Sequence, residues 1–121
     1  MPELQVQKKY DLEDRCLLFA GRIREFVKKL PRSIANIEDG KQVIRSSGSV
    51  GANYIEANEA LSSKDFLMRI KISRKEAKES MYWLRLIVAE NNMMLSHEKE
   101  MLTKEAEELM LIFSSIMRKS E

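Results

Sequence analysis

Apolar residues recur at alternating steps of four and three residues near the start of the chain, and this periodicity is the strongest constraint on the fold. The positions are Leu12, Cys16, Phe19, Ile23, Phe26 and Leu30. Residues at this spacing share one face of a helix, whereas in a strand they would scatter over both faces. The spacing predicts a helix over residues 11–30, with Asp11 as its N-cap and Pro31 ending it.

Three further helices are predicted over residues 37–60, 63–91 and 96–119. Ser62 and Ser96 are the expected N-caps of the last two, because a serine oxygen can accept a hydrogen bond from the first turn. The inward positions, serines included, are Val43, Ser47, Val50, Tyr54, Ala57 and Leu61, then Phe66, Ile70, Ser73, Ala77, Ser80, Leu84 and Ile87, then Leu102, Ala106, Leu109, Phe113 and Ile116.

Short connections between these helices predict an all-α, antiparallel up-down-up-down four-helix bundle. A chain of 121 residues has the size of one domain, so residues 1–121 are expected to form a single bundle. No apolar run approaches the ~20 residues that span a bilayer, and the first residues lack the apolar region of a signal peptide. The single cysteine excludes an intramolecular disulfide and fits a reducing compartment. We therefore expect a cytoplasmic protein without membrane contact.

Small residues crowd the middle of the second predicted helix. The run includes Ser46, Ser47, Gly48, Ser49, Gly51 and Ala52. Glycine inside a helix costs about 1 kcal/mol relative to alanine, so such a run indicates that another backbone packs closely against it. Two interpretations fit: a contact between subunits, or tight packing inside one bundle with Gly48 facing a bulky side chain such as Trp83.

The centre of the chain resembles a family of bacterial four-helix-bundle proteins encoded by intervening sequences in 23S ribosomal RNA genes. The resemblance lies in R-S-x-x-S-[VI]-x-x-N-x-x-E-A from Arg45 to Ala57, in Ser63 to Phe66, and in K-E-A-x-E-x-x-Y-W-L from Lys75 to Leu84. A related bundle is the accessory variability-determinant protein of diversity-generating retroelements.

The resemblance implies a homo-pentamer of four-helix bundles arranged as a short barrel. For the retroelement relatives it also implies binding of a reverse transcriptase and of nucleic acid. It favours a subunit contact at the small-residue run, and the expected interface residues are Arg45, Ser47, Gly48, Gly51, Asn53 and Glu56.

Polar residues follow the small-residue run, and Asn53 and Glu56 line one side of the helix. A di-iron site would need Glu-x-x-His motifs on facing helices, and the chain has only His97, so no metal or other cofactor is expected. Pairing with Arg45, Arg69 or Arg74 is one interpretation of the cluster. A solvated polar face is the other.

The third predicted helix is strongly basic: residues 64–78 contain six basic and two acidic residues. The candidate nucleic-acid-binding residues are Lys64, Lys71, Arg74, Lys75, Lys78 and Arg85. Five of them, all except Arg74, recur at spacings of seven, four, three and seven residues and so share one helical face, which would attract phosphates without reading bases.

A solvated charged face is an equally simple interpretation of these basic residues. Two functions therefore remain open. One is an oligomeric scaffold that binds RNA or DNA. The other is an adaptor for a protein partner such as a reverse transcriptase. No nucleophile with its base and no phosphate-binding loop is present, so we do not expect an enzyme.

Overall fold

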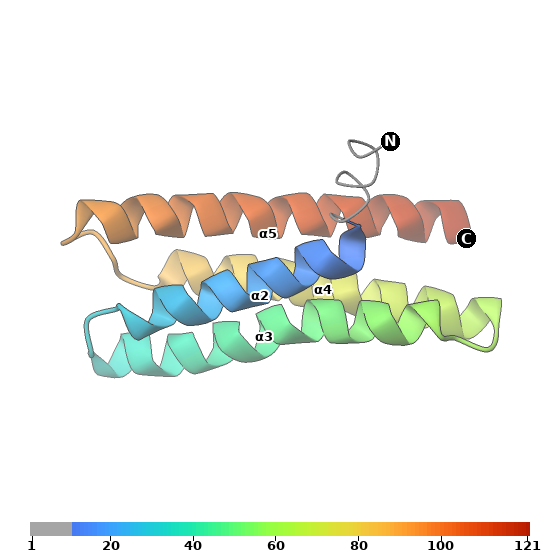
Figure 1. Cartoon of the computed structure of the whole chain (residues 1–121), viewed down its shortest axis with the longest axis horizontal. Helices are drawn as coiled ribbons and strands as arrows, with labels where there is room; N and C mark the ends of the chain where they lie inside the picture. The colour runs from blue at the N-terminus through green and yellow to red at the C-terminus, as the bar shows by residue number, and fades with distance from the viewer. Residues whose placement is uncertain (1–10) are drawn as a thin grey trace, which may run out of the picture.

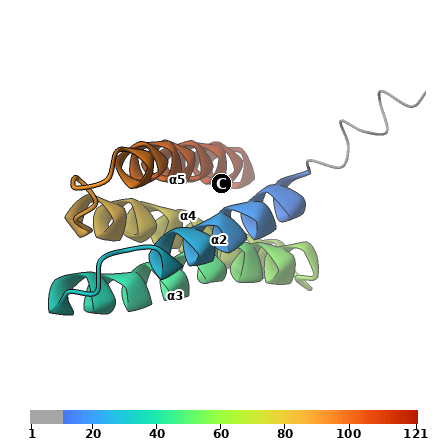
Figure 2. The same cartoon turned by 60° about the vertical axis from the view of Figure 1, so that its left-hand side comes forward.

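The computed structural model describes residues 11–121, which form four helices and no strand (Figure 1). The helices are α2 (Leu12–Lys28), α3 (Ile34–Asn58), α4 (Ser63–Leu86) and α5 (Met93–Ser120). Each helix packs against its neighbour along the chain, and α2 also contacts α5, so the four close into a bundle (Figure 2). The all-α prediction is confirmed for the described residues.

Side chains predicted from the apolar periodicity fill the interior. The largest fully buried side chains are Phe19, Phe26, Phe113, Ile23, Ile70, Leu84, Ile87, Leu102, Leu109, Val43, Val50 and Cys16. Leu61 is a correction: the second helix ends at Asn58, so Leu61 lies in the α3–α4 connection and is 97% exposed. The periodicity was therefore right inside the helices and failed only past a helix end.

The helix starts agree with the sequence at two positions and differ at two. Asp11 and Ser62 cap α2 and α4, each accepting a hydrogen bond from the backbone three residues later. Ser33 caps α3, which begins at Ile34 and not at residue 37. Asn92, not Ser96, caps α5, because its side chain accepts from the backbone of Leu95.

The third predicted helix is shorter than its sequence suggests. It ends at Leu86, with Ile87 in an extended conformation, whereas the sequence predicted a helix to residue 91. Ile87 and Ala89 are buried although they lie outside the helix. The connection between α4 and α5 is therefore packed against the end of the bundle.

Candidate nucleic-acid and subunit interfaces

Six basic side chains lie along α4 and define the basic face: Lys64, Lys71, Arg74, Lys75, Lys78 and Arg85. Arg74 is half-buried and the other five are exposed. Within residues 11–121, none of the six forms an ion pair with a carboxylate. Cations that neighbouring acids do not neutralise keep their full attraction for an anionic partner.

Of the acidic residues of α4, only Glu76 is buried. Glu76 is 8% exposed, and its Oε1 atom has no hydrogen-bond partner among the described residues. Burial raises the pKa of the Glu76 carboxyl, the nearby Glu79 raises it further, and Lys75 and Arg45 act in the opposite direction. α4 therefore carries an exposed basic face and, next to Lys75 in the chain, a buried carboxylate at Glu76.

Replacing Glu76 with glutamine should stabilise the bundle at neutral pH. The raised pKa means that the folded chain binds more protons than the unfolded chain between the two pKa values. Stability therefore falls as pH rises through that window, and E76Q should remove this fall. Urea unfolding at a series of pH values tests it: E76Q should gain stability at pH 7 but not below about pH 4. The exposed Glu56→Gln is the control and should change the stability at pH 7 by less than about 0.5 kcal/mol, and an equal gain in both variants would contradict the assignment.

The small-residue run of α3 contacts both α2 and α4, and its contact with α4 includes hydroxyl hydrogen bonds. Ser46 and Ser80 share a hydrogen bond of 2.7 Å, and the hydroxyl of Ser73 donates to the carbonyl oxygen of Val50 at 2.9 Å. Arg69 Nη1 donates to Asn53 Oδ1 at 2.8 Å, one of the pairings expected for the polar cluster. Serine in these positions lets the two backbones approach closely while its hydroxyl is satisfied.

The expected interface residues divide into two groups in this structure. Ser47 is a correction: it is fully buried, and its hydroxyl donates to the carbonyl oxygen of Ile44, so a second chain cannot reach it. Asn53 is half-buried and bonded to Arg69 and Ser49. The residues open to solvent are Arg45 and Glu56, with Gly48 and Gly51 partly so.

Gly51 and Gly48 differ in what surrounds them. A Cβ atom on Gly51 would lie 2.9 Å from Cys16 Cβ of α2, a clash that only a shift of a helix could relieve. A Cβ atom on Gly48 would lie 3.8 Å from Arg24 Nη2, an ordinary contact with the end of a flexible side chain. The sequence had offered Trp83 as a possible neighbour of Gly48, but no atom of Trp83 lies within 4 Å of the position that a Cβ atom on Gly48 would take. Of these two glycines, only Gly51 is needed for packing against α2.

This difference predicts opposite effects for the same substitution. Gly51→Ala should lower the free energy of unfolding by about 1–3 kcal/mol, because overpacking outweighs the gain in helix propensity. Gly48→Ala should raise it by up to about 1 kcal/mol, because only the propensity changes. Urea unfolding followed by circular dichroism compares the two. Equal effects of either sign would show that the α2–α3 contact at Gly51 is not tight.

A groove runs between α2 and α3 on the outer side of the bundle. One part, of about 470 Å³, has Gly21, Gly48 and Ala52 on its surface with Leu17 and Ile55 beside them. Leu17 is 73% exposed and Ile55 is 48% exposed.

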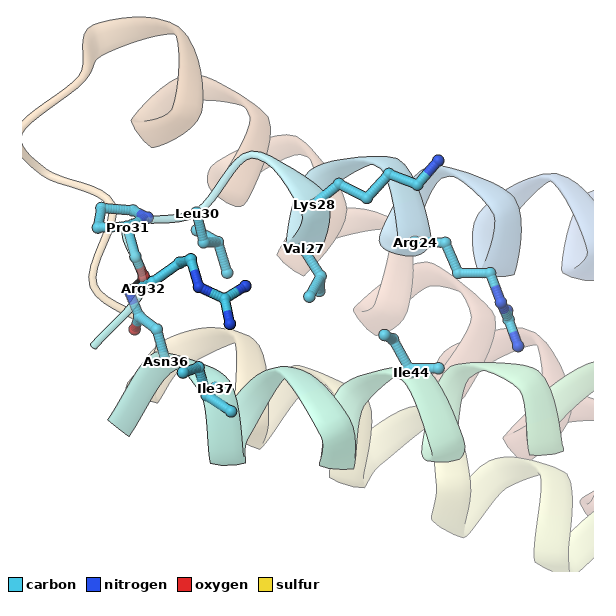
Figure 3. A pocket seen from close by; sticks show the side chains of 9 residues that line it. All are labelled: Arg24, Val27, Lys28, Leu30, Pro31, Arg32, Asn36, Ile37 and Ile44. Atoms are coloured by element: carbon cyan, nitrogen blue, oxygen red, sulfur yellow. Dashed lines mark hydrogen bonds between the residues drawn. The ribbon is translucent and has the colours of Figure 1, made fainter. Parts of the chain in front are cut away.

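A second part of the groove, of about 380 Å³, lies toward the α2–α3 connection, and Arg24 lines both parts (Figure 3). Its apolar side chains include Val27, Ile37 and Ile44, and Figure 3 shows Val27 and Ile44 pointing toward one another across it. The cations beside it are Arg24, Lys28 and Arg32. The groove thus combines an apolar surface with positive charge.

Other chemistry-bearing side chains do not assemble into a site. Within residues 11–121 no three metal-ligating side chains come together, and no helix is long and apolar enough to cross a membrane. His97 is exposed on α5. Burial raises the pKa of the Cys16 thiol to about 12, with a smaller contribution from Glu105 in the same direction, so the thiolate is not formed near neutral pH.

These features define a four-helix-bundle protein with a basic face on one helix and a groove between two others. Residues 8–115 match the model of the 23S rRNA-intervening sequence protein family, so the chain belongs to that family, as its central motifs indicated. Neither this match nor the structural comparison indicates a catalytic family.

A solved structure supports the same assignment. The chain is similar to a crystal structure from Bacteroides thetaiotaomicron, described as a protein with unknown function from the S23 ribosomal protein family. The two are 31% identical with a TM-score of 0.74, and the similarity covers 88% of this chain and 98% of the other. A search of curated proteins finds no match.

Proposed function

We propose that this protein is a non-enzymatic, cytoplasmic scaffold that binds nucleic acid, with RNA as the preferred ligand, through the basic face of α4. The observation that carries the proposal is the row of six cations, none of which forms an ion pair within residues 11–121. A row of lysines and arginines on a helix contacts phosphates, which positions a nucleic acid but does not read its sequence. We expect a preference for structured RNA over any defined sequence.

A filter-binding titration of the wild-type chain against an RNA hairpin at rising salt tests this proposal. If phosphates are neutralised, the logarithm of the affinity should fall linearly with the logarithm of salt concentration, by about 0.9 per phosphate contact. A slope of several units supports the basic face as the ligand site. The absence of retention at low salt, or an affinity that salt does not change, would overturn the proposal.

We propose further that antiparallel bundles of this chain assemble into a homo-pentameric barrel, and that the α2–α3 groove is the contact between them. The groove has small residues at Gly21, Gly48 and Ala52, where a second helix could approach closely. Leu17 and Ile55 would be buried by such a contact and are exposed in the single chain. Light scattering of the purified chain tests the assembly, and a monomer at micromolar concentration would exclude it.

An adaptor for a protein partner such as a reverse transcriptase is the second candidate function. The observation that favours it is a pair of exposed apolar side chains on α4, Met68 at 51% and Leu86 at 45%. Apolar side chains beside a charged face are typical of protein interfaces as well as of solvated surfaces. Under this alternative the chain would not retain RNA in the filter-binding titration.

A further inference from the structure

Tyr82 is an exposed aromatic side chain between the last two cations of the basic face, Lys78 and Arg85. It lies on α4 four residues after Lys78 and three residues before Arg85, so the three side chains share one surface of the helix. Tyr82 is 56% exposed, so its ring adds little to the core. The structure thus places Tyr82 at the surface of the bundle.

The ring of Tyr82 is also held in place. It packs against the indole of Trp83 in an edge-to-face arrangement, with ring centroids 5.1 Å apart and an interplanar angle of 72°. Trp83 is half-buried and packs against the hydrophobic core. An aromatic ring fixed by such a contact loses little conformational entropy when a flat ligand stacks on it.

The charges around Tyr82 indicate the chemistry of that ligand. Lys78 and Arg85 lie about 10 Å apart along the helix, on either side of the ring. Neither forms an ion pair within residues 11–121, although Arg85 shares a surface hollow with Glu90 and Glu100. A flat apolar surface between two cations fits a nucleotide, whose base can stack while the phosphates on either side are neutralised. A protein segment would need acidic side chains at both ends to fit as well.

We propose that Tyr82 stacks on an unpaired base, so that the basic face binds the loops and unpaired segments of RNA in preference to a continuous duplex. This inference rests on the proposed function and adds to it the class of ligand. In a duplex the flat faces of the bases are covered by their neighbours, so Tyr82 could contribute only at ends and loops. An unpaired base can leave its neighbours at much lower cost than a paired one and offer a face to the ring.

Fluorescence anisotropy with labelled oligoadenylate RNA and with an RNA duplex of equal length, on wild type, Y82L and Y82F, tests the inference. Y82L should weaken oligoadenylate binding roughly 5- to 150-fold, the range that removal of one stacking contact produces, and should leave duplex binding unchanged. Y82F should retain wild-type binding because it keeps the ring. Tyr82 is exposed, so neither variant should unfold the bundle.

Trp83 provides a second readout because it is the single tryptophan of the chain. Oligoadenylate should change the Trp83 emission of the wild type and of Y82F, and change it less in Y82L. If Y82L binds both probes as the wild type does, or weakens both equally, the stacking role is wrong while the proposed function stands. If the wild type binds neither probe, the proposed function fails, and the stacking inference fails with it.

Discussion

Reversing the charge of Lys71, Lys75 and Lys78 together should remove most of the affinity for RNA. The three side chains are exposed on the basic face, and the described residues offer them no ion pair. Losing three phosphate contacts should lower the salt slope by about 3, which corresponds to roughly 100- to 1,000-fold in affinity at 0.1 M salt. In a homo-oligomer the loss would be repeated in every subunit that contacts the RNA.

The control for this triple variant is a second one with the same change of net charge elsewhere. Lys29, Lys41 and Lys119 are exposed and lie at the end of α2, on α3 and on α5, outside the basic face and the α2–α3 groove. Their reversal to glutamate should lower affinity only modestly, through the long-range field of the protein. Filter binding at several salt concentrations compares the two variants, with circular dichroism verifying that both remain helical. Equal losses would show that net charge, and not the α4 face, determines binding.

Much of the fold could be predicted from the sequence because it depends on local periodicity. Phe19, Ile23 and Phe26 recur at helical spacing and are fully buried, as are Leu102, Leu109 and Phe113 on α5. The position of the basic face could also be predicted, because residues seven apart on a helix share a side regardless of what packs on the other side. These predictions needed no knowledge of which helix packs against which.

The small-residue run could not be interpreted fully from the sequence because its meaning depends on partners far along the chain. The hydroxyl of Ser46 shares a hydrogen bond with the hydroxyl of Ser80 on α4. The hydroxyl of Ser73, also on α4, donates to the carbonyl oxygen of Val50. Gly51 lies against Cys16 on a different helix. A sequence pattern shows that something approaches closely, but it does not show whether that partner belongs to the same chain. In this structure most of the run is used within the chain, and Gly48 is left at the groove.

The end of α4 could not be predicted for the same reason. No proline or glycine follows Leu86, so local rules would continue the helix to Asn91. Asn36 instead binds the backbone of Val88: its Nδ2 donates to the Val88 carbonyl oxygen, and its Oδ1 accepts from the Val88 amide, both at 3.0 Å. The backbone groups that a longer helix would pair internally are thus satisfied by a side chain 52 residues away in the chain. The sequence placed Asn36 in a loop, whereas it lies buried in the first turn of α3.

Replacing Asn36 with alanine should therefore have the largest effect on stability of the substitutions considered. Asn36 is 3% exposed, and its side chain also donates to the carbonyl oxygen of Pro31, so it joins the α2–α3 connection to the α4–α5 connection. Its loss removes the hydrogen-bond partner of the Val88 amide and of the Val88 carbonyl, both in part-buried hydrogen bonds, at about 1–3 kcal/mol for each, and we expect a total loss of about 3 kcal/mol. Asn58→Ala on the same helix is the matched control. Among residues 11–121 the Asn58 side chain bonds only to Glu13, and both are exposed, so this variant should lose under about 0.5 kcal/mol. Urea unfolding of both variants measures the difference, and a loss below about 1 kcal/mol for Asn36→Ala would mean that water replaces the side chain at Val88.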